Sequence, residues 1–141
     1  MLTWTTYGSW LQGDKRGFVK GGKILSGNKV LESINKTKQK AKKVRLSKKD
    51  IEIIENALLK KTKQLNQKVY ALAVCKNHIH LVLENIELAI GNVVIHYKRA
   101  CKAALAKNGF KGKAWTGGYD KRYIYEQKSL DKRINYVKRH K

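Results

Sequence analysis

Short apolar runs, rich in β-branched and aromatic side chains, alternate along the chain with segments of helical periodicity. Such runs predict strands at residues 1–12, 68–76, 78–83 and 119–125. The second and third runs are separated by a turn at Lys76-Asn77, so we expect them to pair as an antiparallel hairpin.

Apolar residues spaced three or four apart predict three helices. The first begins after Ser47, which can cap it together with Asp50 in a capping box. The second is expected over residues 87–107, where Asn108-Gly109 ends it. The third is expected from about residue 130 to 140, with Ser129 as its cap.

The expected order is strand, helix, strand, strand, helix, strand, helix. This order predicts an α+β, ferredoxin-like domain: an antiparallel sheet with helices on one face and an extra C-terminal helix. At 141 residues the chain has the length of one domain, residues 1–141. Residues from about 20 to 45 are rich in Gly, Asn and Lys, and we expect a basic, irregular insertion there.

Two histidines interrupt the apolar strand at 78–83. Because side chains alternate across a strand, His78 and His80 point to one face, while Ile79, Leu81 and Leu83 point to the other. Two imidazoles side by side on a rigid strand form half of a metal coordination shell. The alternative is a pair of ordinary, half-buried histidines.

The net charge of the chain indicates a polyanionic partner. The chain has 32 Lys and Arg against 10 Asp and Glu, a formal net charge of +22. Nucleic acid is the first polyanion to consider and a membrane surface the second, although no run approaches the roughly 20 apolar residues of a spanning helix. A merely soluble basic surface is the third interpretation.

Cys75 and Cys101 are expected to be reduced and buried, in a cytoplasmic protein.

Two groups of cations are candidate DNA contacts. Lys98, Arg99 and Lys102 cluster on one side of the second helix, and a solvated charged face explains them equally well. Lys121 and Arg122 lie in a strand with interleaved tyrosines, a composition suited to stacking on unpaired bases and binding phosphates. Strand propensity alone also explains the tyrosines.

The last predicted helix carries Tyr136 and His140, four residues apart and therefore on one face. At about 100° per residue, both lie well away from the apolar stripe of that helix. If the helix packs beside the strand of the paired histidines, His140 joins them and the Tyr136 hydroxyl lies next to the metal. A bound cation then acts as a Lewis acid on a phosphate, and the phenol, whose ordinary pKa is about 10, attacks phosphorus once it is activated.

The remaining tyrosines and the fourth histidine are expected to have other roles or positions. Tyr97 lies on the apolar stripe of its helix and is expected in the core, and His96 beside it is expected at the surface. Three further tyrosines are expected on one strand face: Tyr119, Tyr123 and Tyr125.

These motifs together carry a resemblance to a known family. The chain resembles the small HUH transposases that use a single tyrosine, which include the REP-associated tyrosine transposases. The similarity lies in residues 76–81, the Tyr97-Lys98 helix with the tryptophan loop after it, Gly118-Tyr119, residues 133–140 and the opening at residues 6–17.

The resemblance implies a metal-dependent transposase that nicks and rejoins single-stranded DNA, with or without a hairpin, through a 5′-phosphotyrosine link. It implies His78 and His80 as metal ligands, Tyr136 as the nucleophile and a homodimer in which the tyrosine helix can serve the partner. His140 stands where the family commonly has Gln or Asn as a third ligand. We expect Mg²⁺ or Mn²⁺ as the cofactor and a cytoplasmic, nucleoid-associated location.

Two other functions remain open at this point. A non-catalytic DNA-binding protein of the same fold, domesticated from such an enzyme, would bind DNA without needing the histidines. A nuclease using the same metal with water as the nucleophile would release free 5′ phosphates and form no protein-linked DNA.

Overall fold

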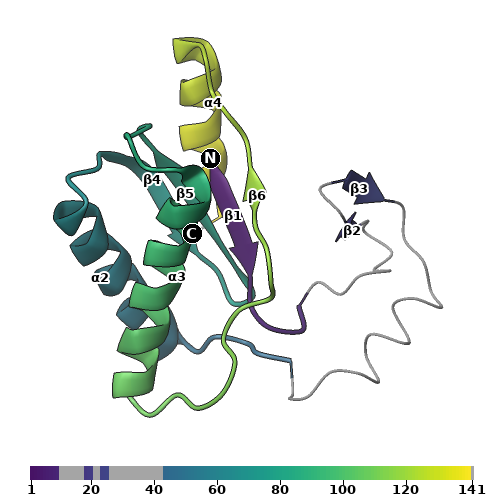
Figure 1. The fold of residues 1–141 in the computed structure, drawn as a ribbon, viewed down its shortest axis with the longest axis vertical. Helices are drawn as coiled ribbons and strands as arrows, with labels where there is room; N and C mark the ends of the chain where they lie inside the picture. The colour runs from purple at the N-terminus through teal and green to yellow at the C-terminus, as the bar shows by residue number, and fades with distance from the viewer. Residues whose placement is uncertain (10–17, 21–22, 26–42, 141) are drawn as a thin grey trace.

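The structure is a computed structural model that describes residues 1–9, 18–20, 23–25 and 43–140. Its strands and helices are arranged as Figure 1 shows. In chain order they are β1 (Leu2–Thr5), β2 (Phe18–Lys20), β3 (Lys23–Leu25), α2 (Lys48–Gln64), β4 (Val69–Val74), β5 (His78–Leu83), α3 (Ile90–Lys107), β6 (Asp120–Lys121) and α4 (Gln127–Lys138).

The main sheet has four strands in the order β4-β5-β1-β6, and each neighbouring pair is antiparallel. Each of the two halves β1-α2-β4 and β5-α3-β6 connects two strands through a helix, and the halves interleave so that β1 and β5 are central. This is the ferredoxin-like arrangement, so the predicted α+β fold is confirmed.

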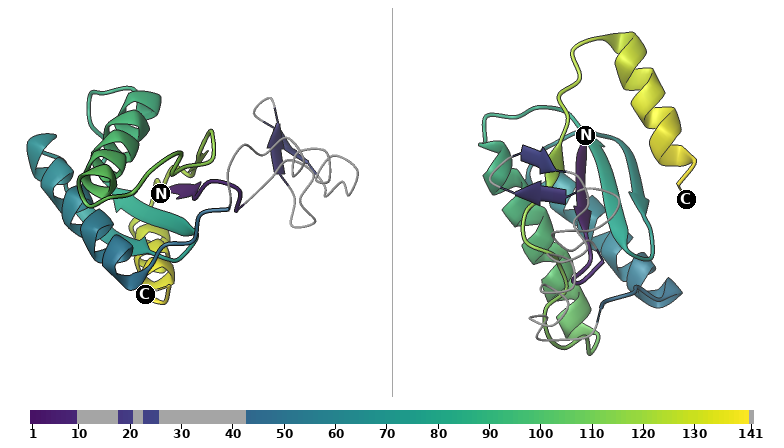
Figure 2. Two further views of the ribbon diagram at one scale, coloured as in Figure 1. Left: turned by 90° about the horizontal axis from the view of Figure 1, so that it is seen from below. Right: turned by 90° about the vertical axis from the view of Figure 1, so that its right-hand side faces the viewer.

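The helices are divided between the two faces of the sheet. Helices α2 and α3 pack together on one face, and α4 lies on the other, where it contacts β4 and β5 (Figure 2). The main core therefore lies between the sheet and α2 and α3, and it includes Trp4, Ile54, Leu58, Ile79, Leu81, Val94, Tyr97 and Leu105. A smaller core under α4 is formed by Ala73, Val82 and Val137.

Helix α2 begins as its sequence predicts. The Ser47 side chain accepts a hydrogen bond from the backbone N–H of Asp50 at 3.1 Å, and the Asp50 carboxylate accepts from the backbone N–H of Ser47 at 2.9 Å. This reciprocal capping box satisfies two N–H groups that the first helical turn leaves without partners. Helix α3 also ends as predicted, with Asn108 at its C-cap and Gly109 at a φ of 95°.

Two predicted boundaries near the C-terminus are wrong. Helix α4 begins at Gln127 with Glu126 as its N-cap, so Ser129 lies inside the first turn instead of capping it. The backbone N–H of Leu130 donates to the Glu126 carbonyl oxygen at 3.0 Å, which closes the turn three residues earlier than expected. The strand expected over 119–125 pairs only at Asp120–Lys121.

The predicted insertion at about 20–45 lies largely outside the described residues, as do residues 10–17 of the opening motif. Within its first part, β2 pairs with β3 as a short antiparallel sheet, where an irregular segment was expected. Across the described part of the chain, no helix combines the length and the apolar character that crossing a bilayer requires.

Adjacent leucines of α2 provide a test of the core. Leu58 is fully buried and Leu59 is 41% exposed. Leu58→Ala should lower the free energy of unfolding by about 2–5 kcal/mol, because it removes buried methyl groups and leaves a cavity. Leu59→Ala should change it by less than about 0.5 kcal/mol. Urea denaturation of the two variants measures both values, and equal losses would contradict the observed orientation of α2.

Candidate active site

The histidine pair occupies the start of β5, a strand paired on both sides. Backbone hydrogen bonds to β4 and β1 hold this strand, so the two side chains project from a fixed backbone. His78 and His80 lie on the face of α4, with ring centroids 4.7 Å apart, while Ile79 and Leu81 enter the main core on the other face. The side-chain alternation predicted for this strand is therefore observed.

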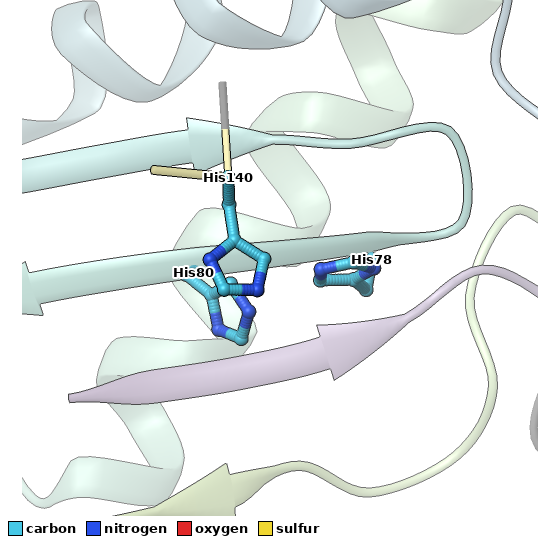
Figure 3. Close-up of side chains that lie close together, drawn as sticks. All are labelled: His78, His80 and His140. Carbon is cyan, nitrogen blue, oxygen red and sulfur yellow. The ribbon is translucent and has the colours of Figure 1, made fainter. Parts of the chain in front are cut away.

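His140 reaches the pair from the end of α4. That helix is anchored by Val137, which is fully buried against the sheet. The helix ends at Lys138, so His140 lies just beyond it, and its backbone N–H donates to the Val137 carbonyl oxygen at 3.0 Å. Its ring centroid lies 4.8 Å from that of His80 and 5.8 Å from that of His78. Figure 3 shows the three rings gathered beside β5.

Each of the three imidazoles has its Nδ1 atom occupied by a neighbour. His78 Nδ1–H donates to Asn77 Oδ1 at 2.7 Å, and His140 Nδ1–H donates to the Tyr136 carbonyl oxygen at 2.8 Å. His80 Nδ1 is hydrogen-bonded to Thr3 Oγ1 at 2.8 Å. With Nδ1 engaged in this way, Nε2 is the atom that each ring presents as a ligand.

Burial keeps the central imidazole uncharged. Desolvation, followed by charge repulsion from the neighbouring His78 and His140, lowers the pKa of His80 to about 4. Desolvation, followed by the effect of His140, also lowers the pKa of His78. Both rings are therefore neutral near pH 7, which is the state that binds a metal.

The donor set fits a divalent metal. One nitrogen from each of the three rings can be chosen so that all lie within 4.8 Å of one another. A metal–nitrogen bond of about 2.1 Å requires nitrogen–nitrogen separations of roughly 3–3.5 Å, so small side-chain rotations would complete the site. If these three residues held a metal, further coordination positions would remain for water or a phosphate oxygen.

Tyr136 lies beside this cluster and is accessible. Its side chain is 41% exposed, as its position off the apolar stripe predicts. Its ring centroid is 4.4 Å from that of His140 and 5.6 Å from that of His80. Helix α4 thus brings both the third imidazole and a phenol to the histidine pair within a single chain.

Tyr97 is excluded as a rival nucleophile. It is fully buried, as predicted, and its hydroxyl donates to Gln67 Oε1 at 2.7 Å. Burial, reinforced by Cys101, raises its pKa and keeps it protonated.

His96 is exposed on α3, as predicted. Cys101 is buried and free as expected, whereas Cys75 is only half-buried, and its thiol donates to the His140 carbonyl oxygen at 3.2 Å.

The candidate DNA-binding cations occupy different surroundings. Lys98 Nζ donates to the carbonyl oxygens of Gly118 at 2.6 Å and Thr116 at 3.2 Å, so it holds the tryptophan loop. Burial lowers its pKa. Arg99 and Lys102 are exposed on α3, across the sheet from the histidines.

The second cation group lies near an open cavity of about 360 Å³. Lys121 and Arg122 are exposed, and Arg122 pairs with Asp120 at 3.2 Å. Arg122 lines the cavity together with Tyr123 and Tyr125. Those two tyrosines are 53% and 87% exposed, with ring centroids 6.3 Å apart, so the strand face expected for them is replaced by an exposed aromatic pair.

Two residues of the site were not predicted from the sequence. Thr3 lies 77 residues before the histidine that it contacts, and no local pattern marks it. Asn77 directly precedes His78, so an amide next to a candidate metal-binding histidine was a signal that sequence reasoning could have used.

Comparisons with known proteins give a similarity at the level of the fold. No known protein family matches the sequence, and no curated protein matches it. The fold is similar to the crystal structure of a "putative transposase" from Deinococcus radiodurans R1, at 14% sequence identity and a TM-score of 0.48. That similarity covers 99% of this chain and 87% of the other.

Acid should destabilise the chelator-treated protein. Unfolded His80 takes up a proton near its ordinary pKa of 6.5, whereas the folded protein resists protonation until about pH 4. The unfolded state therefore binds more protons between these values, and stability should fall as the pH falls from 6.5 to 4. Urea denaturation across this range checks the slope, which His80→Gln should flatten and His96→Gln should not. An unchanged slope in His80→Gln would contradict the depressed pKa.

Proposed function

We propose that this protein is a metal-dependent transposase that nicks and rejoins single-stranded DNA through a 5′-phosphotyrosine intermediate. The observation that carries the proposal is the convergence of His78, His80 and His140 beside the accessible ring of Tyr136. A triad of imidazoles next to a phenol is suited to phosphodiester chemistry, in which a nucleophile attacks a phosphate whose charge is neutralised.

In the proposed step, the Tyr136 hydroxyl oxygen attacks the scissile phosphorus. A bond forms between the tyrosyl oxygen and phosphorus, the bond from phosphorus to the 3′ oxygen breaks, and the phenolic proton is transferred overall to that departing oxygen. The 5′ phosphate stays on the tyrosine as an ester, and attack by another 3′ hydroxyl reverses the step and joins the strands. When bound, the cation supplies Lewis-acid polarisation of a non-bridging phosphate oxygen.

The proposed cofactor is Mg²⁺ or Mn²⁺. Mg²⁺ prefers oxygen ligands, whereas imidazole nitrogen is favoured by the later transition metals. A cluster made of three imidazoles should therefore work better with Mn²⁺ than with Mg²⁺.

The four side chains of the proposed centre come from one chain. The chemistry is therefore proposed to occur in cis, and formation of a homodimer is not needed to complete the centre.

The proposed DNA path includes Lys121, Arg122 and the exposed pair Tyr123 and Tyr125. Cations beside accessible rings bind unpaired nucleotides through phosphate contacts and base stacking. Lys121 Nζ lies 5.8 Å from the centroid of the Tyr123 ring, so a positive charge for a phosphate lies beside a ring that can stack on a base. Arg99 and Lys102 are proposed as weaker contacts, because they lie across the sheet from the centre.

The net charge of +22 by itself supports a second function, non-catalytic binding of DNA. That function requires the basic surface but neither the histidines nor Tyr136. Formation of a covalent adduct distinguishes it from the transposase, and a nuclease that uses water is distinguished by cleavage without an adduct.

Tyr136→Phe should abolish covalent attachment to DNA, because it removes the attacking oxygen and keeps the ring. The measurement is incubation of the protein with end-labelled single-stranded DNA and Mn²⁺ or Mg²⁺, followed by denaturing electrophoresis. Tyr125→Phe is the matched control, since it removes a hydroxyl from a tyrosine that is 87% exposed and belongs to the DNA path. It should keep the adduct.

His80→Ala should also abolish the adduct, by weakening metal binding, while salt-dependent DNA binding persists. An adduct that survives Tyr136→Phe would refute the assigned nucleophile. Cleavage that persists without any adduct would favour the nuclease, and binding without cleavage would favour the non-catalytic function.

Tyr125→Ala should weaken binding of single-stranded DNA by about 1–3 kcal/mol, because a base loses its stacking surface. Tyr125→Phe keeps the ring and should bind like the wild type. Fluorescence anisotropy at several salt concentrations measures both, with Leu59→Ala as an exposed control on α2. Equal affinity of Tyr125→Ala and Leu59→Ala would remove this tyrosine from the DNA path.

A further inference from the structure

We infer that Thr3 is a positioning residue for the proposed metal centre: its hydroxyl accepts the Nδ1–H of His80 and so orients the ring with Nε2 toward the metal. This inference rests on the proposed function, because it assumes that the histidine cluster binds a metal. Thr3 itself touches neither the metal nor the DNA in this scheme.

The register of the sheet carries the inference. Strand β1 pairs with β5 so that Thr3 is directly opposite His80, and both side chains lie on the face of α4. Thr3 Oγ1 is 2.8 Å from His80 Nδ1. The other two imidazoles are held by local partners, Asn77 beside His78 and the Tyr136 backbone four residues before His140. His80 is held from a separate strand.

The chemistry of the hydroxyl explains the need for this contact. A threonine hydroxyl can either donate or accept, and imidazole nitrogen can do the same. When Nδ1–H donates to Thr3 Oγ1, the lone pair is on Nε2, where a metal can use it. The opposite tautomer places a proton on the ligand atom. Contacts of this kind commonly contribute 10- to 100-fold to metal affinity.

The arrangement of β1 provides a matched control. Thr5 is opposite His78 in the same register, on the same face and with a similar, intermediate burial. Among the hydrogen bonds of the described residues, none joins the Thr5 hydroxyl to an imidazole, since His78 Nδ1 is bonded to Asn77. Removing the two hydroxyls in turn thus separates loss of the contact from a general effect on the strand.

The experiment compares the wild type with Thr3→Val, Thr3→Ser and Thr5→Val. Valine keeps the shape and strand propensity of threonine without its hydroxyl, and serine keeps the hydroxyl. Two quantities are measured: affinity for Mn²⁺ alone, from the electron paramagnetic resonance signal of the free ion, and the tautomer of His80 in chelator-treated protein, from imidazole ¹⁵N chemical shifts. Amide spectra verify that each variant is folded.

Thr3→Val should bind Mn²⁺ 10- to 100-fold more weakly and lose the uniform Nδ1–H tautomer of His80. Thr3→Ser should restore both properties, and Thr5→Val should resemble the wild type. Equal behaviour of Thr3→Val and Thr5→Val would overturn the inference while the metal centre stands. If the wild type failed to bind Mn²⁺, the metal centre would be refuted, and an unchanged His80 tautomer in Thr3→Val would still overturn the role of Thr3.

Discussion

The pairing of β5 between β4 and β1 is the constraint on which the rest of the structure depends. A strand with hydrogen-bonded neighbours on both sides has a fixed backbone, and its side chains must alternate between the two faces of the sheet. Ile79 and Leu81 are thereby committed to the main core under α2 and α3. The same periodicity places His78 and His80 on the opposite face, so stability of the fold and geometry of the histidine pair have one cause.

The second face of the sheet is only partly covered, and this makes chemistry possible there. Helix α4 packs through Val137 on a small apolar patch and leaves Tyr136 accessible at its side. Where α4 ends, His140 meets the pair from β5. Partial burial is also the main cause that lowers the pKa of His80 to about 4, so this imidazole is neutral near pH 7 despite the large positive charge of the chain.

The distribution of hydrogen bonds around the imidazoles indicates how the cluster is preorganised. Each Nδ1 atom has a partner from the chain, so the rings are oriented before any ligand arrives. One of these partners is the backbone of Tyr136, which ties the orientation of His140 to the residue proposed as the nucleophile. The orientation of His140 and the placement of the proposed nucleophile are therefore coupled through a single helix end.

The sequence by itself determined the order of the three helices and of the four strands of the main sheet, but not β2 and β3, because hydrophobic periodicity, the Ser47 capping box and the Asn108-Gly109 stop are local signals. It also determined that His78 and His80 share a face, since strand alternation requires no tertiary information. It misplaced the start of α4 and the extent of the strand near Tyr123, where packing outweighs weak local preferences.

Only the tertiary structure decided that α4 lies across the sheet from α2 and α3, that His140 joins the pair, and that Thr3 contacts His80. These are contacts between residues far apart in sequence, and they arise from strand register and from burial of Val137, which local patterns do not encode.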